Sequence, residues 1–475
     1  MVLMFPENWK NRPTRLPRVW PLTLLLGFHC VTQYISIAGV SSSPHLSGGS
    51  TTVFQSGPNA FGLPLANITR NNRRAHVVGN SFFNKNWVTA PASTVARDGL
   101  GPLFNARSCS SCHLRDGRGR PPEQGELMTG LLFRLSSPNQ DGKFVPDSVL
   151  GSQLGVRSIP GAQPEGDVQI SYDEVIGYFD DGSKYSLLKP EYTLTANPIY
   201  GKPSDDIRLS PRIAQPLIGL GLLEALAEKT ILSLSDPDDL DGDGISGRPN
   251  YIWNPEKKIK QLGRFGWKAN QPTLLQQTAS AFVGDIGITS SIRPDESYTS
   301  AQAQILDNFP SGGSPEIDDH LLGRVVTYLQ TLAPPAQRDY NTPDVTRGRD
   351  IFSNTGCASC HIPRLETGNH QHIPELANQI IRPYTDLLLH DMGPELSDKR
   401  PDGEASGSEW RTPPLWGIGL TKIVNGHTRF LHDGRARNLE EAILWHGGEA
   451  DHSRRTYLKL SKLDRKRLLA FIESL

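Results

Sequence analysis

Two stretches of the chain repeat apolar residues at helical spacing. One covers residues 321–332 and runs into Pro334-Pro335, and the other covers residues 463–475 at the end of the sequence. Apolar residues three and four positions apart lie on one face of a helix, and paired prolines end it. We therefore expect a helix at the end of each half of the chain, with a linker at about residues 333–340 between the halves.

A seven-residue apolar pattern also occurs twice. It reads Pro-Leu-Ile-Gly-Leu-Gly-Leu at 216–222 and Pro-Leu-Trp-Gly-Ile-Gly-Leu at 414–420, and an arginine, Arg212 or Arg411, precedes each copy. The first copy starts 103 residues after His113 (residue 216) and the second 53 residues after His361 (residue 414). The chain therefore resembles a duplication whose first half holds about 50 additional residues.

The additional residues are expected to form strands. Three short apolar runs, at 131–135, 167–170 and 185–188, are bounded by Gly, Pro and Asp. Such runs are typical of strands. We predict a small β-rich insertion at about residues 130–205.

The N-terminus predicts export. Basic residues at 10, 12, 15 and 18 precede an apolar run at 19–28, and small residues follow at 38–39. This is the outline of a signal peptide, here expected at residues 1–40; an uncleaved membrane anchor is the alternative, although the run is short for a membrane span. Residues 41–56, rich in Ser, Gly and Thr, are expected to be a flexible leader.

The chemistry is indicated by one pentapeptide pattern, Cys-x-x-Cys-His, which occurs twice. The first motif is Cys109, Cys112 and His113, and the second is Cys357, Cys360 and His361. This is the attachment pattern of c-type haem, with the thiols bonded to the vinyl groups and the histidine bound to the iron. Zinc binding or dithiol redox chemistry are alternatives, but zinc would not explain a histidine directly after each pair.

The rest of the composition agrees with an exported haem protein. Of five cysteines the motifs use four, and Cys30 lies in the expected signal peptide. No cysteine therefore remains for a structural disulfide. The net charge of −1 gives no reason to expect nucleic acid as a partner. We predict a mainly α fold of two cytochrome c-like haem domains, at residues 57–335 and 336–475, the first with the β-rich insertion.

The two halves differ in candidates for the second ligand of each iron. Between His113 and His320 there is no histidine, and the single methionine there is Met128. An open first iron is expected, unless His76, Met128 or His320 folds back onto it, and an open iron allows peroxide or oxygen activation. The second half offers His446 and seven other candidates: His370, His372, His390, Met392, His427, His432 and His452.

An acidic stretch at residues 236–250 suggests a cation site. Asp239, Asp241 and Asp243 alternate and Gly244 follows, as in the first half of a calcium-binding loop. The closing Glu of such a loop is missing, because Asn250 stands in its place. An ordinary acidic turn is the alternative to calcium.

From about residue 71 to its end, the chain resembles the bacterial di-haem oxidoreductases. These are related to the di-haem cytochrome c peroxidases and to the di-haem enzyme that matures the tryptophan-derived cofactor of methylamine dehydrogenase. The resemblance depends on both haem motifs and on the strings at 210–224, 241–248, 262–268, 388–393, 410–416 and 431–436.

The resemblance implies ligands for both irons. In the superfamily, the segment that matches residues 440–448 supplies the second ligand of the second haem, which here is His446. The classical peroxidases also carry a histidine soon after the first motif that must leave before turnover. Residues 114–130 contain none, so the first haem resembles a permanently open site.

These observations together predict a periplasmic peroxidase-type oxidoreductase with two covalent haems. Peroxide is reduced at the first haem with Glu224 as the proton donor, or less favourably Glu123 or Glu126, and the second haem relays electrons from a small cytochrome c or cupredoxin. Oxidation of a protein partner and pure electron transfer are the alternatives. A membrane is involved only if the N-terminal segment is not cleaved.

Overall fold

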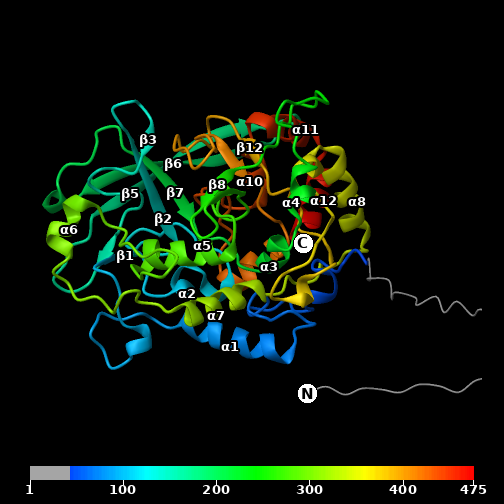
Figure 1. Ribbon diagram of the computed structural model, residues 1–475. Helices are drawn as coiled ribbons and strands as arrows, with labels where there is room; N and C mark the ends of the chain where they lie inside the picture. The colour runs from blue at the N-terminus through cyan, green and yellow to red at the C-terminus, as the bar shows by residue number, and fades with distance from the viewer. Residues whose placement is uncertain (1–42) are drawn as a thin grey trace, which may run out of the picture. The chain divides into compact units, whose positions relative to one another are not determined.

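Helices occur at both ends of each half of the described chain, residues 43–475 of the computed structural model (Figure 1). The expected helices at 321–332 and 463–475 are confirmed as α7 and α12. The expected signal segment and Cys30 lie outside the described residues. The helices are α1 Arg70–Asn84, α2 Cys109–Cys112, α3 Leu220–Glu224, α4 Glu228–Leu232, α5 Leu274–Ala281, α6 Ser300–Leu306, α7 Asp319–Gln330, α8 Pro343–Asn354, α9 Thr421–Asn425, α10 Leu439–Leu444, α11 Asp451–Lys459 and α12 Lys462–Ser474.

The strands pair into several small antiparallel sheets. The pairs are β1 with β4, β5 with β6, β8 with β9, β10 with β11 and β12 with β13, and β2 lies between β3 and β7. The strands are β1 Leu103–Phe104, β2 Leu131–Pro138, β3 Phe144–Val145, β4 Arg157–Ser158, β5 Gly166–Tyr178, β6 Lys184–Ala196, β7 Arg208–Ile213, β8 Tyr251–Asn254, β9 Ile259–Leu262, β10 Leu365–Glu366, β11 Ile380–Ile381, β12 Leu389–Asp391 and β13 Glu409–Arg411.

The expectation of a mainly α, cytochrome c-like fold is wrong. The structure is 30% helix and 18% strand. The runs expected as strands do lie in β2, β5 and β6, but further strands, β8 to β13, lie outside residues 130–205. Strands of two to four residues are too short to give an alternating pattern in the sequence, and for that reason the prediction missed them.

One helix pair in each half packs through a glycine. A Cβ atom on Gly79 of α1 would lie 2.0 Å from the carbonyl oxygen of Arg324 in α7, and one on Gly348 of α8 would lie 2.0 Å from that of Arg467 in α12. A larger residue would push either pair apart. The equivalent contacts agree with a duplicated unit. Each pair lies beside one of the Cys-x-x-Cys-His motifs, since Phe83 of α1 approaches His113 and Phe352 of α8 approaches His361, both with ring centroids 6.3 Å apart.

The buried core contains residues of both halves of the chain. One apolar cluster joins Phe61 and Leu222 of the first half with Trp416 and Val424 of the second. Burying these side chains removes apolar area from water, which is the main favourable contribution to folding. Each half therefore completes part of the core of the other.

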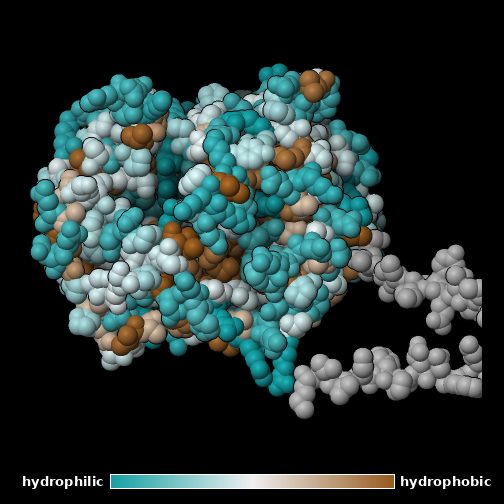
Figure 2. Space-filling model, in the orientation of Figure 1, coloured by the Kyte–Doolittle hydropathy of each residue, from teal (hydrophilic) through white to brown (hydrophobic). Residues whose placement is uncertain are grey.

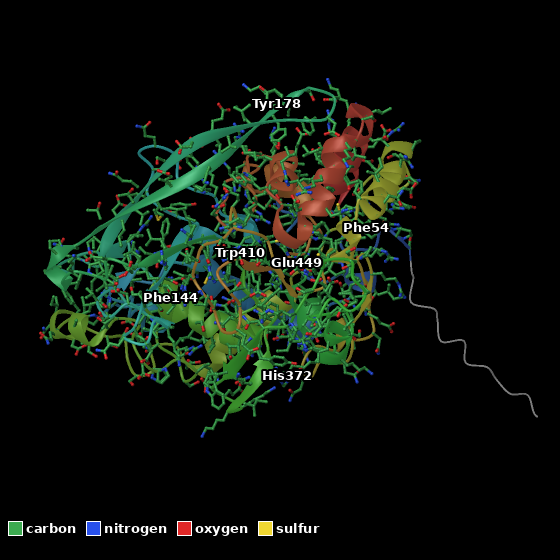
Figure 3. All side chains as sticks on the ribbon, turned by 90° about the horizontal axis from the view of Figure 1, so that it is seen from above. Phe54, Phe144, Tyr178, His372, Trp410 and Glu449 are labelled. Atoms are coloured by element: carbon green, nitrogen blue, oxygen red, sulfur yellow. The ribbon has the colours of Figure 1, made fainter. Side chains whose placement is uncertain are left out.

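The β5–β6 hairpin makes a second connection. Its strands pair over 13 residues each, and Figure 3 shows it running toward the C-terminal helices, with Tyr178 near its tip. There the amide of Asp180 donates to the carbonyl oxygen of Leu458 at 3.2 Å, and Arg465 pairs with Asp181 at 2.8 Å. The β-rich region of the first half thus covers part of the second.

The segment expected as a flexible leader is packed where it is described. Thr51 and Thr52 are buried, and the amide of Val53 donates to the carbonyl oxygen of Pro334 at 3.3 Å. Within residues 43–475, no helix combines the length and the apolar character needed to cross a bilayer.

Candidate functional site: two cavities behind the Cys-x-x-Cys-His motifs

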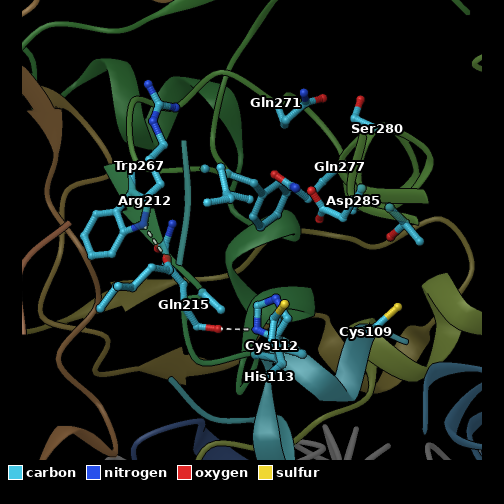
Figure 4. Close-up of a pocket in the computed structure, with 18 of the residues that line it drawn as sticks. Cys109, Cys112, His113, Arg212, Gln215, Trp267, Gln271, Gln277, Ser280 and Asp285 are labelled. Atoms are coloured by element: carbon cyan, nitrogen blue, oxygen red, sulfur yellow. Dashed lines mark hydrogen bonds between the residues drawn. The ribbon is translucent and has the colours of Figure 1, made fainter. Parts of the chain in front are cut away.

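The first motif opens onto a cavity, called the first cavity below. Cys109, Cys112 and His113 all line it. Nδ1 of His113 donates to the carbonyl oxygen of Gln215 at 2.7 Å (Figure 4). This bond fixes the tautomer and leaves Nε2 as the free ring nitrogen. Figure 2 shows hydrophobic residues in a hollow, over the region where Figure 1 draws α3 and α5.

The second motif repeats this arrangement in a second cavity. Cys357, Cys360 and His361 line it, and Nδ1 of His361 donates to the carbonyl oxygen of Tyr384 at 2.8 Å. Burial lowers the pKa of His113 and of His361 to about 4. Both imidazoles are therefore neutral at physiological pH, the form that binds iron.

The residues of both cavities fit a covalently attached haem. Burial raises the pKa of Cys109 to about 12 and that of Cys112 to about 11, so neither thiol is a ready thiolate for a metal. The two cysteine pairs line different cavities, which argues against one zinc site that uses both. Buried guanidinium nitrogens of Arg118, Arg134 and Arg212 at the first cavity lack a hydrogen-bond partner among the described residues, and haem propionates are suitable acceptors.

The wall that faces His113 in the first cavity is polar. Figure 4 shows Gln271, Gln277, Ser280 and Asp285 across the cavity from His113. Amide, hydroxyl and carboxyl groups can orient a small polar molecule but do not compete strongly for haem iron. This wall therefore suits a substrate better than a second protein ligand.

Of the residues expected to fold back onto the first iron, Met128 alone lines the first cavity within the described chain. Met128 is buried with Leu131, Ile213 and Trp267 in one apolar cluster. His76 bonds to Thr331 at 2.8 Å, and His320 lies on the surface beside Arg324. The expectation of an open first iron stays a prediction. Of the three residues, Met128 is the one that lies at the cavity and could bind the iron.

Asp285 is a carboxyl group of the first cavity that the sequence did not reveal. It lies in a short π-helix, Phe282–Ile286, and accepts a hydrogen bond from Nε2 of Gln153 at 2.8 Å. Burial raises the pKa of Asp285 above its ordinary value, although Gln153 and the charge of Arg134 act against this. No motif surrounds it in the sequence. The sign that points to Asp285 is the π-helix, a feature frequent at functional sites. A π-helix can be recognised in a structure but not in the sequence.

Glu224, the expected proton donor, does not line either cavity. Its carboxylate accepts from the amide of Leu274 at 2.7 Å and from Nε2 of Gln330 at 2.6 Å, and it lies 3.3 Å from Nε2 of His370. Burial alone would raise its pKa, but these bonds lower it below the ordinary value of a glutamate. The neighbouring Leu223 does line the first cavity, so the helix turns Glu224 away from it. Glu123 and Glu126 are exposed beside Arg120.

His446 lines the second cavity together with His361. Its Nδ1 donates to the carbonyl oxygen of Ala442 at 2.7 Å, which again leaves Nε2 free. Two other histidines line this cavity but are engaged elsewhere. His390 bonds through both nitrogens, to Glu449 at 2.7 Å and Asp386 at 2.8 Å, and His432 stacks on Trp410 with ring centroids 3.8 Å apart. The arrangement favours His446 as the second ligand, which stays a prediction.

The acidic loop brings together a somewhat different set of carboxylates from the expected one. Oxygens of Asp236, Asp239 and Asp241 lie within 4.8 Å of one another. Asp243 instead accepts from the amide of Ile245 at 2.8 Å. Ser246, at the end of the loop, donates to Glu449 at 2.7 Å, so the loop is connected to His390 at the second cavity.

The two cavities share part of their walls. Arg118, Trp267, Arg411, Pro413 and Pro414 line both. Nε1 of Trp267 donates to the carbonyl oxygen of Ile213 at 2.9 Å, which fixes the indole ring. The groups that occupy the cavities are therefore neighbours.

Comparison with known proteins agrees with a di-haem centre. A solved structure of hydrazine synthase from Kuenenia stuttgartiensis, pressurised with xenon, is similar at 13% identity, with 89% of this chain and 98% of that chain covered. Its TM-score of 0.31 is too low to support an argument. No curated protein matches the chain. The family model described as "Di-haem oxidoreductase, putative peroxidase" matches residues 42–131 and 137–475. Because this match extends over nearly the entire chain and includes both motifs, the protein belongs to the di-haem oxidoreductase family.

Proposed function

We propose that this protein is a peroxidase-type enzyme that reduces peroxide in the first cavity with electrons delivered through the second. The observation that carries the proposal is the difference between the groups that face each motif histidine. His361 shares its cavity with His446, whose Nε2 is free, whereas His113 faces amides and a carboxyl group. A six-coordinate haem iron mainly transfers electrons, and a five-coordinate one can bind and activate peroxide.

In the first cavity each polar residue has a defined task. Gln271 and Gln277 orient peroxide by hydrogen bonds, and Asp285 holds a proton for the departing oxygen atom. The balanced reaction is H₂O₂ + 2 H⁺ + 2 e⁻ → 2 H₂O, so two protons must enter for each peroxide. Because burial raises the pKa of Asp285, its carboxyl keeps a proton at a pH where an ordinary aspartate has lost it.

Asp285 replaces Glu224 in this scheme. A general acid must reach the group that it protonates within hydrogen-bond distance or through one water. Asp285 lines the first cavity, and Glu224 does not. The bonds that Glu224 accepts also lower its pKa, which makes it a poorer donor.

The second cavity receives electrons. His361 and His446 would hold a haem in this cavity, which would supply electron transfer, and Trp267, shared by both cavities, lies between this cavity and the first. The donor is a small cytochrome c or cupredoxin, and the compartment is the periplasm, where haem c is attached in bacteria. We also propose that the acidic loop binds a calcium ion.

Two measurements test the function. The oxidised holoprotein should show one high-spin and one low-spin haem, and it should consume peroxide in steady state with a reduced small cytochrome c as donor. Two low-spin haems without turnover would indicate a pure electron-transfer protein. A high-spin haem without peroxide turnover would indicate oxidation of a protein partner instead.

A further inference from the structure

Arg118 is a buried cation at the boundary between the two cavities. It lines both of them, and its residue is only 6% exposed. Among the described residues, its Nε and Nη1 atoms have no hydrogen-bond partner. A guanidinium group carries five N–H donors and no acceptor, so two donor nitrogens of Arg118 are left without a partner.

The position of Arg118 is fixed by the second half of the chain. Its amide donates to Oδ1 of Asn425 at 3.0 Å, and its carbonyl oxygen accepts from Nε2 of His427 at 3.0 Å. The guanidinium carbon lies 5.9 Å from the ring centroid of Trp267 and 5.6 Å from that of Phe430. The side chain is therefore placed by contacts that do not neutralise its charge.

Two other arginines of the first cavity have more of their charge or donors satisfied, whereas Arg134 bonds to Gln153 but also keeps an unpartnered Nε among the described residues. Arg212 pairs with Asp402 at 2.9 Å, and Arg411 donates to Gly266, Thr412 and Gln215 at 2.9, 3.0 and 2.7 Å. Arg118 has no ion-pair partner in the described chain, and burial alone lowers its pKa to about 10. It is still charged at neutral pH. A buried unpaired charge is unfavourable, so Arg118 requires an anion in the cavities.

We propose that Arg118 is a positioning residue that donates to a propionate of the haem in each cavity. Haem propionates are the carboxylates that a di-haem protein brings to this place, and guanidinium groups bind carboxylates strongly. The inference goes beyond the proposed function, because it concerns the haems whether or not peroxide is reduced. It gives Arg118 the role of holding the two haems relative to one another and of raising both reduction potentials by its charge.

The test compares Arg118→Gln with Arg120→Gln and uses redox titration of the holoprotein followed by its optical spectrum. Arg120 is two residues away, more exposed and paired with Glu126, so its replacement removes the same charge without touching a cavity. A nearby cation disfavours the ferric state, so Arg118→Gln should lower the midpoint potentials of both haems. Arg120→Gln should change neither. A shift of one haem alone, or of neither, would overturn the proposal.

Arg118→Lys provides the second variant if the glutamine protein does not fold. It keeps the charge, so both potentials should stay near those of the unmodified protein, but it cannot reproduce the planar fork of donors. The propionate bending bands in the resonance Raman spectrum should therefore move for both haems. Unchanged bands would exclude a bond between Arg118 and the propionates.

Discussion

The two cavities have the same motif with a half-buried histidine, yet they differ in what faces that histidine. In the first, Gln271, Gln277 and Asp285 lie across from His113, and in the second, His446 accompanies His361. The bond from Nδ1 to a backbone carbonyl is equivalent in both, at 2.7 and 2.8 Å. The comparison teaches that the motif and the bond that orients its histidine are the same in both halves, while the opposite wall of each cavity differs.

The largest expected effect is the loss of the reactive site in the His113→Ala protein. In the unmodified protein, cyanide or azide should perturb one of the two haems, because we propose that only the first has a free coordination position. The variant should lose that response and all peroxide turnover, as measured by anion titration and by steady-state assay. Met128→Leu is the control and should leave the spectrum unchanged. Anion binding at the second haem, or at neither haem, would contradict the assignment of the reactive role to the first haem.

Asp285→Asn should lower peroxide turnover by about 10²–10⁴-fold, the usual contribution of a positioned acid. The asparagine keeps the size of the side chain but cannot give up a proton. Glu224→Gln is the matched control and should change turnover much less, because Glu224 does not line the cavity. The reverse ranking of the two variants would return the proton-donor role to Glu224.

The pH profile should distinguish the same two residues. The pKa of Asp285 is raised, so its carboxyl is protonated below that pKa, and turnover should fall about tenfold per pH unit above it. The groups that face Asp285 are Gln153, Arg134, Cys109 and Cys112. The Asp285→Asn protein should lack this alkaline fall. A profile that is identical in both proteins would assign the fall to another group.

His446→Ala should convert the second haem from low-spin to high-spin and leave the first unchanged. Electron paramagnetic resonance of the oxidised protein measures both haems separately. The matched control is His432→Ala. It removes an imidazole from the same cavity, and that imidazole stacks on Trp410. If His432→Ala rather than His446→Ala changes the spin state, His432 is the ligand.

The smallest effect is expected at the acidic loop. We expect one calcium ion per chain by elemental analysis, lost after treatment with a chelator and absent from Asp241→Asn. Asp243→Asn should retain calcium, because its carboxylate is not grouped with those of Asp236, Asp239 and Asp241. No calcium in the untreated protein would make the loop an ordinary acidic turn.

The sequence alone predicts a site when the residues of that site are neighbours in the chain. Cys109, Cys112 and His113 are adjacent in the chain, so their spacing alone predicts an attachment site. Asp285 could not be found in this way, because it reaches the first cavity only when a π-helix 172 residues after His113 folds against it. Whether Glu224 faces the first cavity also depends on which way its side chain points from the helix, and the sequence does not show that.

The fold could be predicted only in part, for a related reason. Helices such as α7 and α12 show their periodicity over 12 or 13 residues. By contrast, β12 and β13 have three residues each, and their pairing joins segments that are distant in sequence. Such strands form because tertiary contacts hold them, and composition and spacing do not record those contacts.

The mixing of the two halves has a consequence for biosynthesis. Arg115 donates to the carbonyl oxygen of Val424 across 309 positions, and Arg411, Pro413 and Pro414 complete the wall of the first cavity. During translation, the first motif is therefore synthesised long before the residues that enclose it. Contacts this distant in sequence form slowly, so we expect the first cysteine pair to stay accessible until the second half has folded against the first. A chain cut near residue 336 would leave the apolar surface around Phe61 and Leu222 uncovered, and we expect it to aggregate.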